Sequence, residues 1–324
     1  MANCLSRFGR LGGSFVLALW LGGCTAGAQS EADQGAGSPT QVDALKGPVP
    51  IVSLQGVEST AAPSAQANDF DCKPSSEHPE PVILVHGLGS TADGNWFYHG
   101  PRIASAGYCV FALTYGTGLL GPWVGGLASM ADSAAELGTF VDKVLASTGA
   151  SKVDIVGHSE GTTVPAYYMK FLGGDAKVKH FVGFGANYKG TTLHGLSTLI
   201  GLLTSVAPGL ADLFSRHACA SCLEFMPGSP FAQKLNDGGV TVAGPSYTNI
   251  VSRVDNVVTP YTSGVVEGAG DNVTNIVLQD ACRFDTAGHL GMAIDPNITQ
   301  LILRGLDPEN AAPLRCQPFT TLGI

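Results

Sequence analysis

Charged side chains are scarce in this 324-residue chain, where Asp, Glu, Lys and Arg together make up 13% of the residues, about half of the usual share. Basic residues are the scarcer sign, with 17 Lys and Arg against 26 Asp and Glu and a formal net charge of −9. Proteins that bind nucleic acid need a basic surface to meet the phosphates, so this balance excludes that class. It also disfavours other anionic partners.

The sequence also lacks a hydrophobic run that reaches the length of a membrane span, which is about 20 residues. The N-terminal apolar run covers only residues 11–21, and it follows Arg7 and Arg10 with no acidic residue before it. A short basic segment followed by a short apolar one is the order of a secretory signal peptide. We therefore predict a signal peptide at residues 1–23 and an exported protein, extracellular or in the cell envelope.

The predicted signal ends in Leu21-Gly22-Gly23-Cys24, which resembles the lipobox of bacterial lipoproteins. A lipid on Cys24 would tether the protein to the outer face of a membrane. The alternative is an ordinary signal peptide that is cleaved at Thr25-Ala26-Gly27-Ala28. Residues 24–68 are rich in small and polar residues without apolar periodicity, which predicts a flexible linker. Residues 69–324 have the length of one large α/β domain.

Motifs that bind metal ions are absent: the sequence has no His-Glu-x-x-His and no carboxylate-rich cation loop. The pair Cys219 and Cys222 lacks the second Cys or His pair of a zinc site and the strand-to-helix context of a redox motif, so we expect a local disulfide. An even number of cysteines in an exported protein favours disulfides, although the sequence leaves many pairings open. The six cysteines beyond Cys24 are Cys72, Cys109, Cys219, Cys222, Cys282 and Cys316. We expect neither a metal nor a cofactor.

Glycine is abundant, with 43 residues, but it follows no regular period. What recurs is a short apolar, β-branched run, and helical patterns occur between such runs, at residues 130–146 and 162–172. This alternation predicts an α/β fold with a mostly parallel sheet covered on both faces. The six predicted strands are residues 81–85, 109–113, 152–156, 181–184, 247–251 and 273–278.

Ser159 lies in Gly157-His158-Ser159-Glu160-Gly161, directly after a predicted strand and before a predicted helix. In such a turn the serine projects from a sharp, strained bend, and the two glycines avoid clashes with the strand and the helix. The serine oxygen then lies at a helix N-terminus, where free N–H groups favour developing negative charge. We predict that Ser159 is a nucleophile. The alternative, a helix-capping serine in a glycine-rich loop, does not account for this context.

A serine hydroxyl needs a base to take its proton, and after such an elbow the chain order is Ser, then acid, then His. His289 is the one histidine after the fifth predicted strand, and Asp255 directly follows that strand. We predict that His289 is the base and that Asp255 orients its imidazole. Asp271, Asp280 and Asp285 are rival acids. We prefer Asp255 because the acid must come from the end of a neighbouring strand.

The oxyanion of an acyl-transfer reaction needs two N–H groups aimed at it. We assign one to the backbone of Glu160, which follows the nucleophile, and the other to Leu88 in the loop after the first strand. The carboxyl group of Glu160 would lie near a site that develops negative charge. We therefore expect the side chain to point away, toward a polar partner.

These motifs together resemble α/β-hydrolase lipases, and more closely the secreted class 2 lipase family of actinobacteria. The matching segments are residues 85–89, 108–116, 157–161, 189–193, 252–255 and 289–291, and the Cys219/Cys222 pair before Pro227-Gly228-Ser229. The resemblance covers residues 70–318. It implies a minimal α/β-hydrolase fold, ester hydrolysis without a cofactor, and the disulfides Cys72–Cys109, Cys219–Cys222 and Cys282–Cys316. The family commonly has Gln after the serine and a further Gly beyond the motif, where this chain has Glu160 and Thr162.

Two segments beside the predicted site are nearly uncharged: residues 116–130 carry no charge, and residues 193–214 carry only Asp212. They are interpreted either as core or, preferably, as a cap whose apolar face meets an acyl chain or a lipid surface. The sequence thus predicts a carboxylic ester hydrolase, a lipase or esterase, that acts on lipid or other apolar esters. Polyester or cutin hydrolysis and acyl transfer to a lipid alcohol are the enzymatic alternatives. A lipid-binding cell-envelope lipoprotein is the non-enzymatic one.

Overall fold

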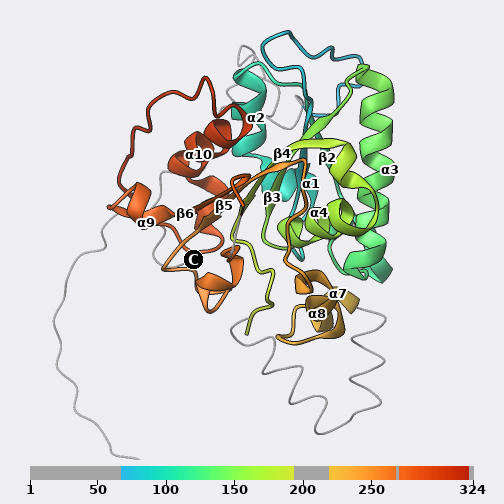
Figure 1. Ribbon diagram of the computed structural model, residues 1–324, viewed down its shortest axis with the longest axis vertical. Coiled ribbons are helices and arrows are strands. Elements are labelled where there is room, and N and C mark those ends of the chain that lie inside the picture. Colours follow the sequence, from blue (N-terminus) through green and yellow to red (C-terminus); the bar gives the residue numbers. More distant parts are fainter. Residues whose placement is uncertain (1–66, 193–218, 268–269, 321–324) are drawn as a thin grey trace, which may run out of the picture. The chain divides into compact units, whose positions relative to one another are not determined.

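A six-stranded parallel sheet forms the centre of the computed structural model, which describes residues 67–192, 219–267 and 270–320 (Figure 1). The strand order is β2-β1-β3-β4-β5-β6, and every neighbouring pair is parallel. The strands are β1 Val82–Val85, β2 Val110–Leu113, β3 Val153–His158, β4 Val178–Phe184, β5 Ser246–Val251 and β6 Val273–Val277. The predicted α/β-hydrolase fold with about six mostly parallel strands is confirmed.

The two faces of the sheet hold separate apolar cores, as the alternation of side chains along a strand requires. In β1, Val82 and Leu84 contribute to one core, whereas Ile83 and Val85 contribute to the other. The first face is covered by α2 His99–Ser105 and α10 Pro296–Leu306, and the second by α3 Met130–Thr148 and α4 Glu160–Phe171 (Figure 1). Burial on both faces explains why β1 and β2 are continuously apolar, whereas the partly buried β6 carries Thr and Asn.

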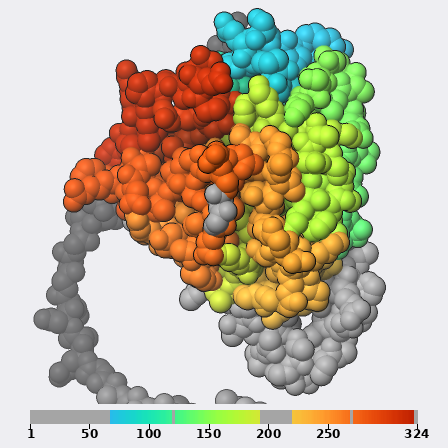
Figure 2. Space-filling model, viewed as in Figure 1, coloured from blue at the N-terminus to red at the C-terminus, as the bar shows by residue number. Residues whose placement is uncertain are grey.

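Shorter elements complete the domain. They are α1 Ala92–Trp96, η2 Gly118–Trp123, η3 Gly174–Ala176, α7 Ala220–Glu224, α8 Pro230–Asn236, η4 Tyr261–Gly264, α9 Leu278–Ala281, β7 Asp285–Thr286, η5 Gly291–Ile294 and β8 Phe319–Thr320. α7 and α8 lie beside α3 and α4, as the yellow-orange and green surfaces of Figure 2 show. The strands β7 and β8 pair in parallel, which holds the C-terminal tail beside the segment that follows α9.

Contacts of the domain begin by Asn68, one residue before the predicted domain start. Its N–H donates to the backbone oxygen of Val110 at 2.9 Å, and its side chain bonds to both the N–H and the oxygen of Ala112, each at 2.9 Å. These bonds occupy the free edge of β2, which would otherwise offer unpaired backbone groups. The predicted signal peptide, Cys24 and most of the predicted linker lie outside the described residues.

The three disulfides that the family resemblance implies are present: Cys72–Cys109, Cys219–Cys222 and Cys282–Cys316. The first ties the N-terminal segment to the start of β2, and the third ties the end of α9 to the C-terminal tail. Among the helices of the described residues, none is both long enough and apolar enough to cross a membrane.

Candidate active site

Ser159 forms the turn between β3 and α4 in a backbone conformation that few non-glycine residues adopt. Its φ is 57° and its ψ is −122°. The glycines of the motif are required by space, because a Cβ on Gly157 would lie 1.9 Å from the backbone oxygen of Gly161. A Cβ on Gly161 would lie 2.0 Å from the backbone oxygen of Val85. The chain can therefore make this turn only with glycines at both positions.

Ser159, His289 and Asp255 form a line of two hydrogen bonds. The Nε2 of His289 lies 2.8 Å from the Oγ of Ser159, and its Nδ1 lies 2.8 Å from the Oδ2 of Asp255. The other carboxylate oxygen of Asp255 accepts the N–H groups of Val257 at 2.9 Å and Val258 at 2.8 Å, which fixes its orientation. With Nδ1–H donated to the carboxylate, Nε2 is left as an acceptor for the serine proton.

The rival acids do not contact His289 in the structure. Asp280 forms a bidentate ion pair with Arg253 on the surface, at 2.8 and 2.6 Å. Asp285 is buried and accepts the N–H of Ala287 at 2.9 Å. Asp271 is exposed. Among the four candidate acids, Asp255 is the one that contacts His289 in the described structure.

The loop after β1 lies directly against the elbow, since a Cβ on Gly87 would stand 3.0 Å from the Cβ of Ser159. Leu88 lines the cavity above Ser159. The loop is tied to the uncharged segment 116–130 by the N–H of Gly89, which donates to the oxygen of Gly125 at 2.9 Å. Leu88 in this loop and Glu160 at the first turn of α4 therefore lie next to the serine on two different elements.

The Glu160 side chain lacks, among the described residues, the polar partner that the sequence led us to expect. Its carboxyl is fully buried, and neither oxygen has a hydrogen-bond partner among the described residues. It points beneath the loop after β1, where a Cβ on Gly126 would lie 2.6 Å from its Oε2. Burial, and secondarily the charge of Glu224, hold the pKa of Glu160 well above its ordinary value. The enclosed carboxyl is therefore neutral, because a buried charge without a partner costs more than a bound proton.

Asn95 and His158 connect the two loops that meet at Ser159. The Nδ1 of His158 lies 2.9 Å from the Oδ1 of Asn95, and its Nε2 lies 3.1 Å from the backbone oxygen of His289. The same Asn95 oxygen accepts the N–H of Gly87 at 3.2 Å. Sequence reasoning missed Asn95, because no motif marks a residue that acts only through contacts across the fold.

A cavity of about 390 Å³ opens above Ser159, at the carboxyl ends of β1 and β3. The strand order reverses between these two strands, which is where open α/β sheets bind their ligands. The lining is mostly apolar, and Phe97 and Leu290 are 53% and 60% exposed. The apolar lining residues are Leu88, Phe97, Phe225, Val257, Leu290, Ala293 and Ile294.

Of the two nearly uncharged segments that were interpreted as core or cap, the structure describes only the first, residues 116–130. Gly125 and Gly126 of the first segment pack against His86 and Glu160 beneath the loop after β1, while Trp123 is 82% exposed. The described side chains of this segment lie outside the cavity lining. The second segment, residues 193–214, lies outside the described residues.

Metal ligands do not gather in the part of the chain that the structure describes: no three His, Cys, Asp or Glu side chains there could hold a metal ion. The cavity lining instead combines serine hydroxyls, the imidazoles of His158 and His289, two asparagine amides and apolar side chains. Such a set can perform proton transfer and nucleophilic attack without a bound ion.

A parallel sheet with a serine elbow, followed along the chain by an acid and a histidine, defines an α/β-hydrolase. The family model described as Lipase (class 2) matches residues 79–301, which is more than half of the chain. The chain belongs to this family, as the resemblance of its motifs indicates.

Solved structures of lipases and esterases are also similar to this chain. Aspergillus fumigatus lipase B has 20% identity over 76% of this chain and 55% of its own, with a TM-score of 0.57. The mature Bacillus licheniformis lipase BlEst2 has 18% identity over 55% of this chain and 67% of its own, with a TM-score of 0.41. A thermophilic esterase from Thermogutta terrifontis has 14% identity over 70% and 90%, with a TM-score of 0.46. The first likeness shows a shared fold, and this chain spans about half the length of that fungal lipase.

Proposed function

We propose that this protein is a carboxylic ester hydrolase that cleaves lipid esters through a Ser159–His289–Asp255 triad and an acyl-enzyme intermediate. The observation that carries the proposal is the pair of 2.8 Å hydrogen bonds that join the three side chains below an apolar cavity. Membership of the class 2 lipase family supports the same activity.

In the first half of the reaction, the Nε2 of His289 takes the proton of Ser159 as the serine oxygen attacks the ester carbonyl carbon. The carbonyl oxygen becomes an oxyanion, which the N–H groups of Leu88 and Glu160 hold. Asp255 stabilises the imidazolium that forms. The tetrahedral intermediate then breaks its bond to the alcohol oxygen, and the departing alcohol takes the proton from His289.

In the second half, water replaces the alcohol. His289 takes a proton from the water as its oxygen attacks the acyl carbon, and a second oxyanion forms in the same N–H pair. The bond to the Ser159 oxygen breaks, the serine regains its proton from His289, and the carboxylic acid leaves. The enzyme returns to its starting state with one ester and one water consumed.

Replacement of Ser159 by Ala tests the nucleophile. We expect a loss of at least about 10⁴-fold in kcat/KM on a p-nitrophenyl ester, because removing a triad member leaves only the oxyanion site and binding. Labelling by an alkyl fluorophosphonate should disappear in the same variant. Ser151→Ala, which changes an exposed serine, is the matched control and should keep both activities. Labelling that survives in Ser159→Ala would overturn the assignment.

The apolar cavity supports a substrate with an acyl chain rather than a charged group. A series of p-nitrophenyl esters of increasing chain length, measured beside an emulsified triglyceride, tests this preference. We expect kcat/KM to rise with chain length and turnover to rise when the ester is emulsified. Equal turnover of dissolved and emulsified ester would identify a plain esterase.

Export is part of the proposal. The disulfides are consistent with an extracellular protein, and the resemblance to secreted actinobacterial lipases agrees with a signal peptide at residues 1–23. A linker over residues 24–68 would then join a lipidated Cys24 to the catalytic domain. Labelled palmitate should be incorporated by the wild type and not by Cys24→Ala. Incorporation by neither would remove the lipid anchor from the proposal.

A further inference from the structure

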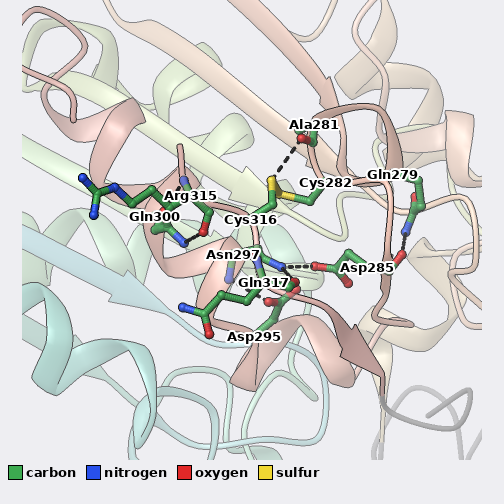
Figure 3. The surroundings of a disulfide bond; sticks show 10 residues. All are labelled: Gln279, Ala281, Cys282, Asp285, Asp295, Asn297, Gln300, Arg315, Cys316 and Gln317. Atoms are coloured by element: carbon green, nitrogen blue, oxygen red, sulfur yellow. Dashed lines mark hydrogen bonds between the residues drawn. A yellow bond between two sulfur atoms is a disulfide. The ribbon is translucent and has the colours of Figure 1, made fainter. Parts of the chain in front are cut away.

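Two carboxyl groups are buried at the two ends of the loop that carries His289. Asp285 lies in β7 and Asp295 caps α10, and their exposed fractions are 1% and 0%. Asn297 donates a hydrogen bond to each of the two carboxyl groups, which places them close together. Figure 3 shows both beside Asn297 and close to the Cys282–Cys316 disulfide. Neither carboxyl takes part in the mechanism given above.

The partners of the four carboxyl oxygens differ. Asp285 accepts on both oxygens, from the N–H of Ala287 at 2.9 Å and from the Nδ2 of Asn297 at 2.7 Å. Asp295 accepts the N–H of Asn297 on Oδ1 at 2.7 Å, whereas its buried Oδ2 meets no donor among the described residues. A proton on the Oδ2 of Asp295 would supply the donor, and Asp285 could accept it. Geometry therefore places the shared proton on the Oδ2 of Asp295.

Opposing effects act on Asp295. A helix N-cap ordinarily favours the ionised carboxylate, and the N–H groups of Asn297 and Ile298 do lower its pKa. Burial and the facing Asp285 are the larger effects, and they raise the pKa of Asp295 to about 8. Two carboxylates in contact without water cannot both stay ionised, so the pair retains one proton near neutral pH.

Other ionisable groups near the pair do not neutralise it. His99 of α2 packs against α10 and η5, and burial lowers its pKa to about 4, so it is uncharged near neutrality. Arg304 of α10 donates to the backbone oxygen of Ala312 in the C-terminal tail. Arg315 in the same tail points its guanidinium away from both carboxyls (Figure 3).

We propose that Asp285 and Asp295 share one proton and thereby hold the two ends of the His289 loop together, an arrangement that we call the one-proton clasp. The clasp positions the imidazole of His289 against Ser159. Asp285 holds the N–H of Ala287, two residues before His289, and the Oγ of Ser252 donates to the oxygen of Ala287 at 2.6 Å. The two aspartates are positioning residues, because they act on the substrate only through His289. The inference rests on the proposed function, in which His289 is the base.

The C-terminal tail braces the clasp from outside. Asn297, which bonds to both aspartates, also donates from Nδ2 to the backbone oxygen of Gln317 at 2.7 Å and accepts its N–H on Oδ1 at 2.9 Å. The neighbouring Cys316 is joined to Cys282, so the tail cannot easily leave the loop. Loss of the shared proton at alkaline pH would leave two negatively charged carboxylates in contact. Their repulsion would separate the two ends of the His289 loop.

Asparagine substitutions separate the two aspartates. In Asp295→Asn the amide keeps an acceptor for the N–H of Asn297 and supplies an N–H to Asp285 without a titrating proton. In Asp285→Asn the amide has only one acceptor oxygen. Its NH₂ group would therefore face either the N–H of Ala287 or the Nδ2 of Asn297, and that hydrogen bond would be lost. We therefore expect asparagine to be tolerated at position 295 and to destabilise the protein at position 285.

The pH profile of kcat/KM on a dissolved p-nitrophenyl ester is the decisive measurement. Loss of one proton with a pKa of about 8 predicts that the wild type falls about tenfold between pH 7 and pH 9. Asp295→Asn should lose that decline, and Asp271→Asn, which makes the same substitution at an exposed position, should keep it. An alkaline decline that persists in Asp295→Asn overturns the proposal, as does equal tolerance of asparagine at both positions.

Infrared difference spectroscopy follows the shared proton without using activity. The neutral carboxyl of Glu160 would add a protonated-carboxyl band of its own, so the measurement uses Glu160→Gln. This variant should show one such band, which disappears as the pH is raised through about 8. The band should be absent when Asp295→Asn is added. A titrating band in a protein without ester hydrolysis would leave the clasp in place while the proposed function fails. The absence of any such band overturns the clasp, whether or not the variants fold.

Discussion

At the scale of single residues, the site depends on a strained serine whose strain the fold absorbs. A non-glycine residue in such a backbone region costs on the order of 1–3 kcal/mol. The N–H of Ser159 donates to the oxygen of Phe184 at 3.0 Å, and the hydroxyl of Thr162 donates to the oxygen of Ser159 at 2.7 Å. Thr162, one of the two departures from the family pattern, thus helps to hold the elbow before substrate binds.

Glu160, the other departure, should make the stability of the protein depend on pH. Its folded pKa is raised, first by burial, so the folded state binds a proton that the unfolded chain releases above its ordinary pKa of about 4.5. Stability is therefore full below that pH and falls as the pH rises toward the folded pKa. We expect Glu160→Gln to melt at a higher temperature than the wild type at pH 8 and at an equal one near pH 4, in calorimetry.

Glu309→Gln is the control for this measurement, because it removes an exposed carboxylate. It should change the melting temperature little at either pH. If Glu160→Gln also melts no higher than the wild type at pH 8, then the carboxyl is not held neutral in the folded protein.

At the scale of elements, the unit that matters is β3, the elbow and α4. The strand is buried along its whole length, and the helix starts immediately after the serine. Sheet, turn and helix N-terminus are therefore fixed relative to one another by packing on both faces. The backbone of the serine gains its position from this unit.

Gly157→Ala should disrupt that unit. The added methyl group would meet the backbone oxygen of Gly161 at 1.9 Å, so either the strand or the helix must move. We expect a loss of several kcal/mol in the free energy of unfolding and at least about a hundredfold loss of kcat/KM. Chemical denaturation and ester hydrolysis measure the two effects.

Gly100→Ala is the matched control. Its added Cβ would meet no atom closer than 3.5 Å, and alanine is favoured over glycine within helix α2. Unfolding free energy should stay equal or rise by less than about 1 kcal/mol. Wild-type behaviour of Gly157→Ala would mean that the elbow can relax and that the glycine is not required.

At the scale of the whole molecule, covalent and polar ties secure the sheet at its margins. Asn68 and the Cys72–Cys109 disulfide fix the N-terminal segment along β2, and the Cys282–Cys316 disulfide fixes the C-terminal tail near β7. The cavity above Ser159 lies at the carboxyl ends of the strands, and none of the six disulfide cysteines lines it. Stability and chemistry thus use different parts of the domain.

Removal of the Cys72–Cys109 disulfide should lower the stability of the protein and leave its activity almost unchanged. The bridge closes a loop of 37 residues, for which the chain-entropy relation gives about 3–4 kcal/mol. We expect Cys72→Ala/Cys109→Ala to lose that free energy of unfolding while kcat/KM changes by less than about twofold at 25 °C. The short Cys219–Cys222 loop, with a separation of 3, should contribute less by the same relation. A larger loss of activity than of stability in Cys72→Ala/Cys109→Ala would contradict this division.

The amino-acid sequence by itself determined what depends on local pattern. Apolar, β-branched runs predicted the six strands, and the runs are continuous where a strand is buried on both faces, as β1 and β2 are. The Gly157-His158-Ser159-Glu160-Gly161 segment predicted the elbow, because only small residues fit around that turn. The order of elements then selected Asp255 and His289 from their rivals, and the structure brings both to Ser159.

Only the tertiary structure decided what depends on contacts between distant segments. It buried the Glu160 carboxyl without a partner, although the sequence suggested that the side chain would find one. It joined Asn95 to His158, and it set Asp285, a rejected rival for the catalytic acid, against Asp295. The physical reason is that a turn or a strand is encoded by neighbours in sequence. The protonation and the partner of a buried group are set instead by whatever packing excludes water around it.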